Sequence, residues 1–305
     1  MRQKIKNKNI TWINITNPTE KDVEFLKNDF NICPSILKEY RPKIKRPKVE
    51  EFNNYLFTVI HFPVFNNKIR KTVSTELDII LYRNILITSY SGSFPELKRL
   101  FDKCHTEKLV REYYMTKNAV CFIYRILNKL IDTRMPMLDH IDDRIDKIEK
   151  EIFSGNERKM VSEIAIVKHD IISFRKIVKP QRMVLESLIR MATKITNENL
   201  TRISAEVIGS NIKVWHTLEN HKETTEALEH TNESLLSYKL SDTMKVLTAF
   251  SVLVLPMSLI ANAFGMNLVK GMPFAQSPLG FWIVVIIMFI IMFFSFIFFK
   301  FKKWI

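Results

Sequence analysis

The chain has 305 residues, of which 47% are hydrophobic and 26% are charged, and its formal net charge is +14. This length can hold one large soluble domain together with a membrane anchor. The basic excess does not indicate nucleic-acid binding, because lysines alternate with acidic residues along the chain and no helix-turn-helix or RNA-binding motif accompanies them. The three scattered cysteines predict neither a disulfide framework nor a zinc knuckle.

Residues 10–110 have the pattern of a mixed α/β domain. Lys21–Asn31 suits a helix, and Arg83-Asn84 suits a hairpin turn between two strands. Strands are predicted where β-branched and aromatic residues gather, at Trp12–Ile15, Asn54–Val64, Glu76–Tyr82 and Asn84–Tyr90. No Gly-rich phosphate loop and no nucleophile–base motif occurs here, so the sequence indicates neither a nucleotide site nor an enzyme.

From about Met115 the pattern becomes helical. Apolar residues recur at intervals of three and four along two successive segments, which predicts two helices that pack through these stripes. The first stripe is Leu138, Ile141, Ile145, Ile148 and Ile152, and the second is Ile164, Val167, Ile171, Phe174 and Val178. Ser154-Gly155-Asn156 fits a turn between them. The rest of the first helix is largely acidic, which is typical of a solvated face: Asp139, Asp142, Asp143, Asp146, Glu149 and Glu151.

The next segment predicts one very long helix. Asn199 can cap its start, and Leu200–Phe264 would then extend about 100 Å at roughly 1.5 Å per residue. Its last 19 residues, from Val246 to Phe264, carry no charge, which is enough to cross a bilayer core. A second uncharged segment, Phe281–Phe299, follows after a short loop. Two adjacent spans of this kind predict a membrane hairpin.

The first span carries a stripe of mostly polar residues, whereas the second is almost uniformly Ile, Val, Phe and Met. The stripe residues recur at steps of three and four and therefore share one helical face: Ser241, Met244, Thr248, Ser251, Leu255, Ser258 and Asn262. Hydrocarbon leaves such polar groups unsatisfied, so the stripe must face protein or water. Both helix–helix packing and the lining of a pore are consistent with it.

The charged flanks predict the orientation. Lys239 and Lys245 precede the first span and three lysines follow the second, against Lys270 alone in the loop. The start of the chain has basic residues but no apolar segment behind them, so we expect no signal peptide. Both termini are therefore expected in the cytoplasm, with the chain crossing the cytoplasmic (inner) membrane twice.

The segment around Gly265-Met266-Asn267 resembles a known family. The tripeptide directly follows the long helix that begins its membrane part at Met244–Thr248, and Met272-Pro273, a second span and a basic end come after it. This combination closely resembles the CorA family of magnesium transporters. Further segments are similar to family landmarks in the same order, namely Thr11–Ile15, Arg46–Glu50 and Ile141–Asp143. The resemblance covers nearly the whole chain.

The resemblance implies an α+β fold that assembles as a homopentameric funnel in the lipid bilayer. Each subunit would hold a cytoplasmic α/β domain, a helical hairpin, a long stalk helix and a two-helix transmembrane hairpin. The expected boundaries are 1–118 for the α/β domain, 119–198 for the hairpin, 199–264 for the stalk and first span, 265–280 for the extracellular loop, 281–299 for the second span and 300–305 for the basic tail.

The resemblance also implies roles for individual residues in the uptake of Mg²⁺, with Co²⁺ or Ni²⁺ as further ions. Gly265, Met266 and Asn267 would form the selectivity filter for a hydrated ion. The stripe residues would line the pore together with Leu247, and apolar rings of Met244, Leu247 and Leu255 would close it. Glu39 and Glu206 match two family acids that bind a regulatory divalent ion, Mg²⁺, between neighbouring subunits. Lys300, Lys302 and Lys303 would form a basic ring that attracts the acidic helical hairpin.

Two positions depart from the family pattern. Phe274 stands where family members often have Glu, and no acidic residue occurs from Thr243 to Ile305; Ser241 stands where Asn is common. Two other functions therefore stay open. One is the zinc-transporting branch of the superfamily, and the other is a membrane-anchored sensor or scaffold for divalent cations that conducts nothing.

Overall fold

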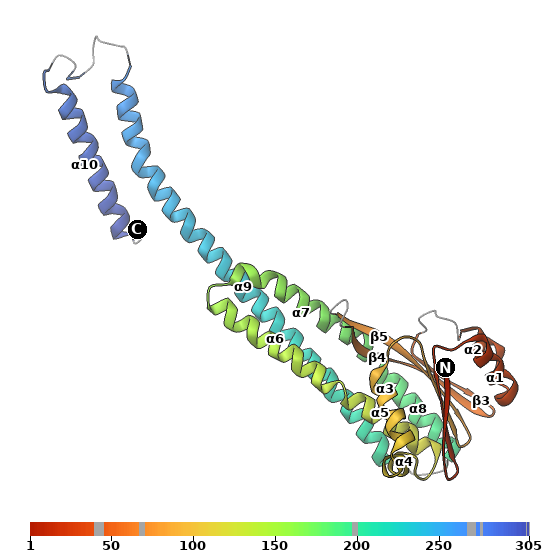
Figure 1. Ribbon diagram of the computed structural model, residues 1–305. Coiled ribbons are helices and arrows are strands. Elements are labelled where there is room, and N and C mark those ends of the chain that lie inside the picture. Colours follow the sequence, from red (N-terminus) through yellow and green to blue (C-terminus); the bar gives the residue numbers. More distant parts are fainter. Residues whose placement is uncertain are drawn as a thin grey trace. The chain divides into compact units, whose positions relative to one another are not determined.

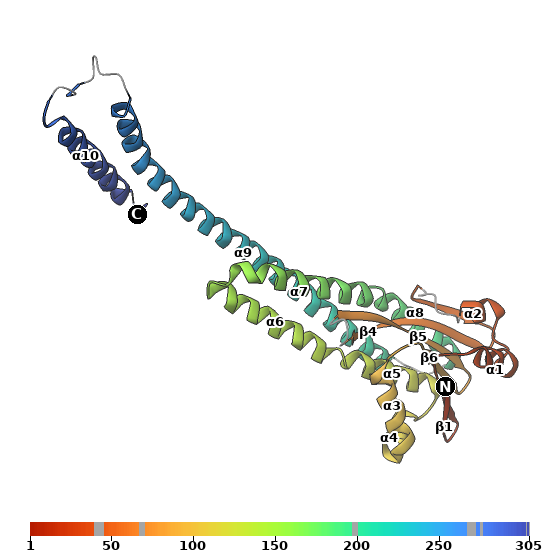
Figure 2. The same ribbon diagram turned by 45° about the horizontal axis from the view of Figure 1, so that its top comes forward.

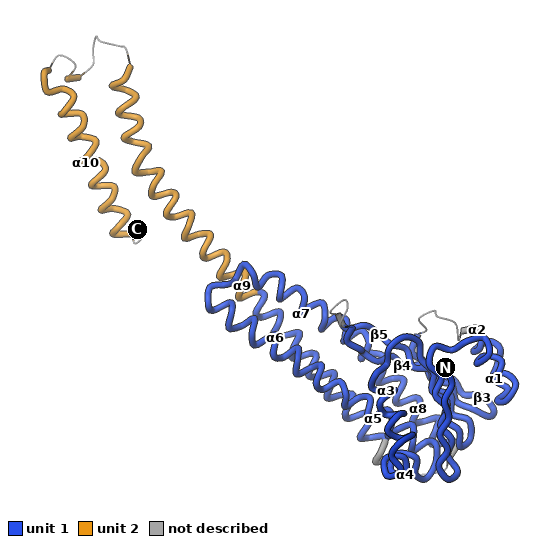
Figure 3. Tube along the Cα trace, in the orientation of Figure 1, with its two compact units in different colours: residues 1–229 blue, residues 230–305 orange. Residues whose placement is uncertain are grey.

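The computed structural model describes residues 1–39, 46–66, 71–196, 201–266, 273–274, 277–302 and 304, without the side chains of residues 38–39, 71, 195–196 and 201–203. The chain divides into two compact units, Met1–Glu229 and His230–Ile305 (Figure 3). The first unit combines a sheet with helices, and the described part of the second is built from helices (Figure 1). The α+β class predicted from the sequence is confirmed.

The first unit is built on a sheet whose described strands have the order β1-β2-β6-β5-β4-β3. Neighbouring strands are antiparallel except β2 and β6, which are parallel. The strands are β1 (Arg2–Asn7), β2 (Ile10–Thr16), β3 (Lys48–Phe52), β4 (Tyr55–Asn66), β5 (Lys71–Tyr82) and β6 (Ile85–Tyr90). The predicted hairpin is present between β5 and β6, and Arg83 in its turn has a φ of +50°.

The strands β1 and β3 are the two edges of this sheet, and the sequence patterns do not predict them. In β1, charged Arg2, Lys4 and Lys6 alternate with other residues, and only Ile5 is buried. An edge strand with little apolar alternation gives a weak sequence signal. The same lysines discourage the exposed edge from pairing with other chains.

Alternate residues of β2 pack on opposite faces of the sheet, as the period of two requires. Ile13 and Ile15 belong to a core with Leu26 and Phe30 of α1 (Glu20–Phe30) and with Ile36 of α2 (Pro34–Glu39). On the other face, the fully buried Trp12 packs edge-on against Phe101 and Phe122, with ring centroids 4.7 and 5.1 Å away. These rings come from α3 (Pro95–Thr106) and α5 (Ala119–Asp132), and α4 (Lys108–Tyr114) lies between those helices in the chain.

The predicted helical hairpin is formed by α6 (Met135–Phe153) and α7 (Glu157–Val178), and α8 (Gln181–Thr196) follows it. Every residue of the two predicted apolar stripes is buried. Arg144 of α6 joins the two helices through Asp170 and Glu163 of α7, at 3.3 and 3.7 Å. The acidic residues of α6 are largely exposed in the single chain.

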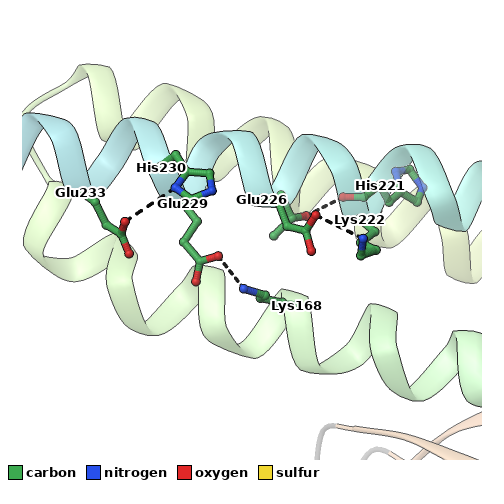
Figure 4. Close-up of polar contacts among 8 residues, drawn as sticks. Lys168, His221, Lys222, Glu226, Glu229, His230 and Glu233 are labelled. Atoms are coloured by element: carbon green, nitrogen blue, oxygen red, sulfur yellow. Dashed lines mark hydrogen bonds and ion pairs between the residues drawn. The ribbon is translucent and has the colours of Figure 1, made fainter.

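The long helix is continuous as α9 (Thr201–Phe264), and in the first unit it packs along the hairpin (Figures 1 and 2). Three polar contacts tie α9 to α6 and α7. They are Arg175 Nη2 to Glu219 Oε1 at 2.5 Å, Lys168 Nζ to Glu229 Oε2 at 2.5 Å, and His221 Nδ1 to Asp142 Oδ1 at 3.4 Å. Figure 4 shows Lys168 reaching Glu229 across the two helices. Pairs within α9, such as Lys222–Glu226, add to the charged character of this part of the helix.

The second unit holds the end of α9 and the helix α10 (Gly280–Phe301). Among the described residues, α9 and α10 are the two helices long and apolar enough to cross a membrane. Many large apolar side chains of both helices are exposed in the single chain. A helix that is apolar on all sides and exposed suits surrounding lipid, as expected of a membrane protein.

Candidate functional site

The polar stripe of α9 lies away from α10. Ser251 is half-buried and the other six stripe residues are exposed. By contrast, Ala249 is fully buried and Leu253 lines an apolar groove with α10. At about 100° per residue, the centre of the stripe lies nearly opposite the face that holds Ala249 and Leu253. Packing against α10 of the same chain therefore does not explain the stripe.

Within the stripe, Ser251 makes a local hydrogen bond. Ser251 Oγ donates to the Leu247 carbonyl at 2.9 Å, a bond within the helix that hydroxyls of membrane helices commonly form. The larger exposed residues on or beside this face include Leu240, Met244, Leu247, Leu255 and Leu259, each more than half exposed. The face therefore alternates hydroxyl groups with apolar side chains.

The helix α9 ends directly before the tripeptide. Gly265 N–H donates to the Ala261 carbonyl at 2.9 Å and closes the last turn. A Cβ at Gly265 would lie 3.2 Å from that same carbonyl oxygen, so a side chain there would crowd the end of the helix. Met266 is exposed. Asn267, the residue that the sequence predicts for the centre of the filter, lies outside the described residues.

The loop returns to α10 through a tight contact. Phe274 has a φ of +64°, and its carbonyl accepts from Ser277 N–H at 3.1 Å. A Cβ at Gly280 would lie 2.2 Å from the Phe274 carbonyl oxygen, so only glycine fits there. Phe274, Gly280 and Gly265 line a common pocket of about 450 Å³. Phe274, which stands where family members often have Glu, therefore lies beside Gly265, the first residue of the tripeptide.

The two candidate regulatory acids are described unequally. Glu39 ends α2, and its side chain lies outside the described residues. Glu206, in α9, accepts a hydrogen bond at Oε1 from Asn128 Nδ2 at 3.0 Å. It lines a largely polar pocket of about 440 Å³ together with Asp132 and other residues of α5. The meeting of Glu39 and Glu206 between subunits stays a prediction.

Asn128 and Asp132 line the pocket beside Glu206, and the sequence patterns did not single them out. They lie one helical turn apart on α5 and face the same pocket as Glu206. Desolvation in the pocket raises the pKa of the Asp132 carboxyl; Lys129 lowers it, and the nearby Glu206 carboxylate adds to the rise. The four-residue spacing of Asn128 and Asp132 places both on one face of a helix. It does not indicate that Glu206, which is 78 residues from Asn128, lies beside them.

The remaining candidates belong to the end of the chain. Lys300 lies in the last turn of α10 and Lys302 is its C-cap, whereas Lys303 lies outside the described residues. The attraction expected between these lysines and the acidic face of α6 joins different units and stays a prediction. Within the described residues, no group of three or more His, Cys, Asp or Glu side chains could hold a metal ion.

Known proteins resemble this chain along nearly its whole length. The family model described as "CorA-like Mg2+ transporter protein" matches residues 7–303. The "Cobalt/magnesium transport protein CorA" of Thermotoga maritima is 28% identical over 296 residues, 96% of this chain and 83% of the relative. The protein of the same name from Methanocaldococcus jannaschii is 24% identical over 290 residues, 95% of this chain and 90% of the relative.

The solved structures show a similar fold. The complete CorA magnesium transporter from Methanocaldococcus jannaschii matches with a TM-score of 0.83 at 22% identity. The match covers 99% of this chain and 93% of that structure, so it includes both the sheet and the two long apolar helices. These relatives are named as transport proteins and not as enzymes.

Proposed function

Because the chain belongs to the family of CorA-like Mg²⁺ transporter proteins, we propose that it forms a channel-like pathway for Mg²⁺, and also for Co²⁺ or Ni²⁺, across the cytoplasmic membrane. Transport of divalent cations is the class of function that the family description and the names of the relatives share. The route, the selection of the ion and the gate are the finer parts of the proposal.

The observation that carries the proposal is the stripe on the face of α9 turned away from α10. A single two-helix hairpin cannot enclose a pore, and hydrocarbon does not satisfy exposed hydroxyl groups. Several copies arranged in a ring enclose a pore and keep these hydroxyl groups out of hydrocarbon, because each copy turns its stripe toward a common water-filled axis. We propose a homopentamer in which the α9 helices form the inner ring and the α10 helices face lipid.

Selection is assigned to Gly265, Met266 and Asn267 at the outer end of this ring. Mg²⁺ is small, prefers oxygen ligands and loses its water reluctantly. A ring of Asn267 amide oxygens and Gly265 carbonyls can accept hydrogen bonds from the first-shell waters without removing them. A neutral ring also binds a divalent ion weakly enough to let it leave.

The membrane potential supplies the driving force. It is worth about 2.3 kcal/mol per elementary charge per 100 mV, and twice that for a divalent ion. With both termini in the cytoplasm, as the flanking lysines predict, the tripeptide stands at the outer end and the potential draws the ion inward from it. Since residues 243–305 hold no acidic side chain, the outer mouth has no fixed negative charge to concentrate cations. We therefore expect low apparent affinity together with transport.

Gating is assigned to two places. Met244, Leu247 and Leu255 form apolar rings that exclude water when the pore is narrow. Glu39 and Glu206 of neighbouring subunits bind a regulatory Mg²⁺ and hold the ring closed when cytoplasmic Mg²⁺ is high. Without the ion, close carboxylates repel one another.

Flux into liposomes tests the proposal. We expect purified protein to admit Mg²⁺ under an imposed inside-negative potential, and we expect Asn267→Ala to abolish uptake while the oligomer stays assembled. Asn28→Ala, the loss of an exposed amide on α1, is the matched control and should transport normally. Near-normal uptake by Asn267→Ala would contradict the filter.

The same assay separates the alternatives. A preference for Zn²⁺ over Mg²⁺ at equal concentration would place the chain with the zinc transporters. Binding of Mg²⁺ with no flux of any divalent ion would make it a sensor or scaffold.

A further inference from the structure

Arg134 is a fully buried guanidinium at the start of α6, where it is the N-cap residue. It is 1% exposed, and burial lowers its pKa to about 9. The group therefore still carries its charge near neutral pH. Burying a charge without a counter-charge is costly, so what neutralises Arg134 is a structural question.

The described residues offer Arg134 no carboxylate. Its Nη1 donates to Gln181 Oε1 at 2.5 Å, and the guanidinium lies 4.8 Å from the centre of the Phe62 ring. Its Nε and Nη2 are buried and have no hydrogen-bond partner among the described residues. Glu76 Oε2 lies 3.6 Å from His61 Nε2, on the strand that holds Phe62.

The neutral acceptors around Arg134 are already in use. Gln181 Oε1 accepts a second hydrogen bond, from Asn211 Nδ2 at 2.9 Å. The amide group of Gln181 donates in turn to the His61 carbonyl. Gln181 and Asn211 are 0% and 2% exposed, so the cluster is closed to bulk water. The two free guanidinium nitrogens thus need an acceptor that the cluster itself does not supply.

The helix ends around Arg134 do not supply a net charge. Arg134 lies between the end of α5 and the start of α6, and Gln181 begins α8 shortly after α7 ends, so a negative and a positive helix end adjoin at each place. The charge to be neutralised in the cluster is therefore that of the guanidinium itself. A water molecule would satisfy a hydrogen bond but would leave this charge in place.

We propose that Arg134 Nε and Nη2 bind a small monovalent inorganic anion of the size of chloride. Enclosure by Arg134, Gln181 and Asn211 argues against a larger, polyatomic anion. The anion would neutralise the guanidinium and link four elements, since α6, α8, α9 and β4 all contribute to the cluster. The site concerns the soluble unit and is independent of the proposed ion pathway.

Thermal unfolding of the purified full-length protein tests the proposal. The midpoint is compared in sodium chloride and sodium gluconate at equal ionic strength, because gluconate is too large for the site. We expect chloride and bromide to raise the midpoint by about 2–4 °C below about 200 mM salt, as a ligand that binds only the folded state does. Arg134→Met should lose this difference.

Arg175→Met is the matched control. Arg175 is also held by an aromatic ring, that of Trp215, but it has the carboxylate of Glu219 as its own counter-charge. This variant should be less stable than wild type and should keep the chloride response. Loss of the response in both variants would contradict a specific role for Arg134.

Crystals of the wild-type protein grown with bromide give a direct answer that does not depend on whether Arg134→Met folds. We expect an anomalous peak within about 3.5 Å of Arg134 Nε or Nη2. If no peak appears, the site holds water only and the proposal is wrong. A peak without a thermal response below about 200 mM would mean binding at crystal concentration only, and it would also overturn the proposal.

Discussion

At the scale of single residues, two glycines show how differently the same residue type is used. Gly280 has the Phe274 carbonyl oxygen at 2.2 Å from the place of a Cβ, so the loop closes only over a glycine. Gly209, in the third turn of α9, has no atom within 4 Å of that place. The first glycine is required by a close approach, whereas the second only weakens a helix.

This difference gives opposite predictions for the same substitution. Gly280→Ala forces the backbone at Phe274 to move and should cost about 1–3 kcal/mol, as overpacking does. Gly209→Ala should stabilise the protein by about 0.5–1 kcal/mol, because alanine favours the helix. Thermal unfolding of both variants measures the effect. Equal shifts of the midpoint would show that the Phe274 contact does not constrain the chain.

His221 provides a prediction for pH. Burial lowers the pKa of its imidazole below the usual 6.5, although Asp142 at 3.4 Å, a hydrogen bond to the Leu138 backbone and Asp139 oppose the shift, in decreasing order. A lowered pKa means that the folded state prefers neutral His221. Its contribution to stability is thus complete above pH 6.5 and is lost as the pH falls through the lowered pKa.

We therefore expect the wild-type protein to lose more stability than His221→Asn between about pH 7 and pH 5. Unfolding midpoints across this range give the comparison. His216→Asn, an exposed histidine on the same helix, should follow the wild-type curve. Parallel curves for wild type and His221→Asn would mean that protonation of His221 does not affect the packing of α9 on α6.

At the scale of the element, α9 is one helix with two kinds of surroundings. In the first unit its buried side chains include Val207, Val214 and Leu218, and Glu219, His221 and Glu229 contact α6 and α7. From Val246 onward α9 carries no charge, and its polar stripe lies on the face turned away from α10. A continuous helix transmits displacement along its axis, which suits a proposed gate at Met244 and a proposed sensor at Glu206.

The gate can be tested on this helix alone. Met244→Asn places a polar amide on the stripe, so water should enter the closed pore more readily and basal Mg²⁺ leak into liposomes should rise several-fold. Val246→Asn makes the same change off the stripe and is the control. Unchanged leak in Met244→Asn would exclude an apolar constriction at this position.

At the scale of the whole molecule, regulation requires contacts between copies of the chain. Glu39→Lys combined with Glu206→Lys should leave transport intact and remove inhibition by cytoplasmic Mg²⁺, because a regulatory ion would lose its carboxylate ligands. The measurement is Mg²⁺ flux over a range of internal Mg²⁺ concentrations. Glu24→Lys with Glu223→Lys changes the charge equally at exposed positions and should keep the inhibition. Inhibition of the first double variant over the wild-type range would rule out these acids as the sensor.

The sequence by itself determined the features that depend on neighbours along the chain. The stripes of α6 and α7, the continuity of α9, the two apolar spans and the β5–β6 turn all follow from periods of two to four residues or from uninterrupted apolar runs. The family likeness rests on the same kind of local signal, since Gly265-Met266-Asn267 directly follows the long helix. These patterns needed no information about distant partners.

Only the tertiary structure decided which distant segments meet. Asn128 and Glu206 are 78 residues apart, and Arg134 and Gln181 are 47 apart, so no local pattern pairs them. The edge strands β1 and β3 become strands because β2 and β4 offer them hydrogen-bonding partners. For the stripe of α9, the position of α10 shows that packing within the same chain does not account for it, and pore lining stays a proposal. In each case the energy comes from contacts between segments, and the sequence of either segment alone does not contain it.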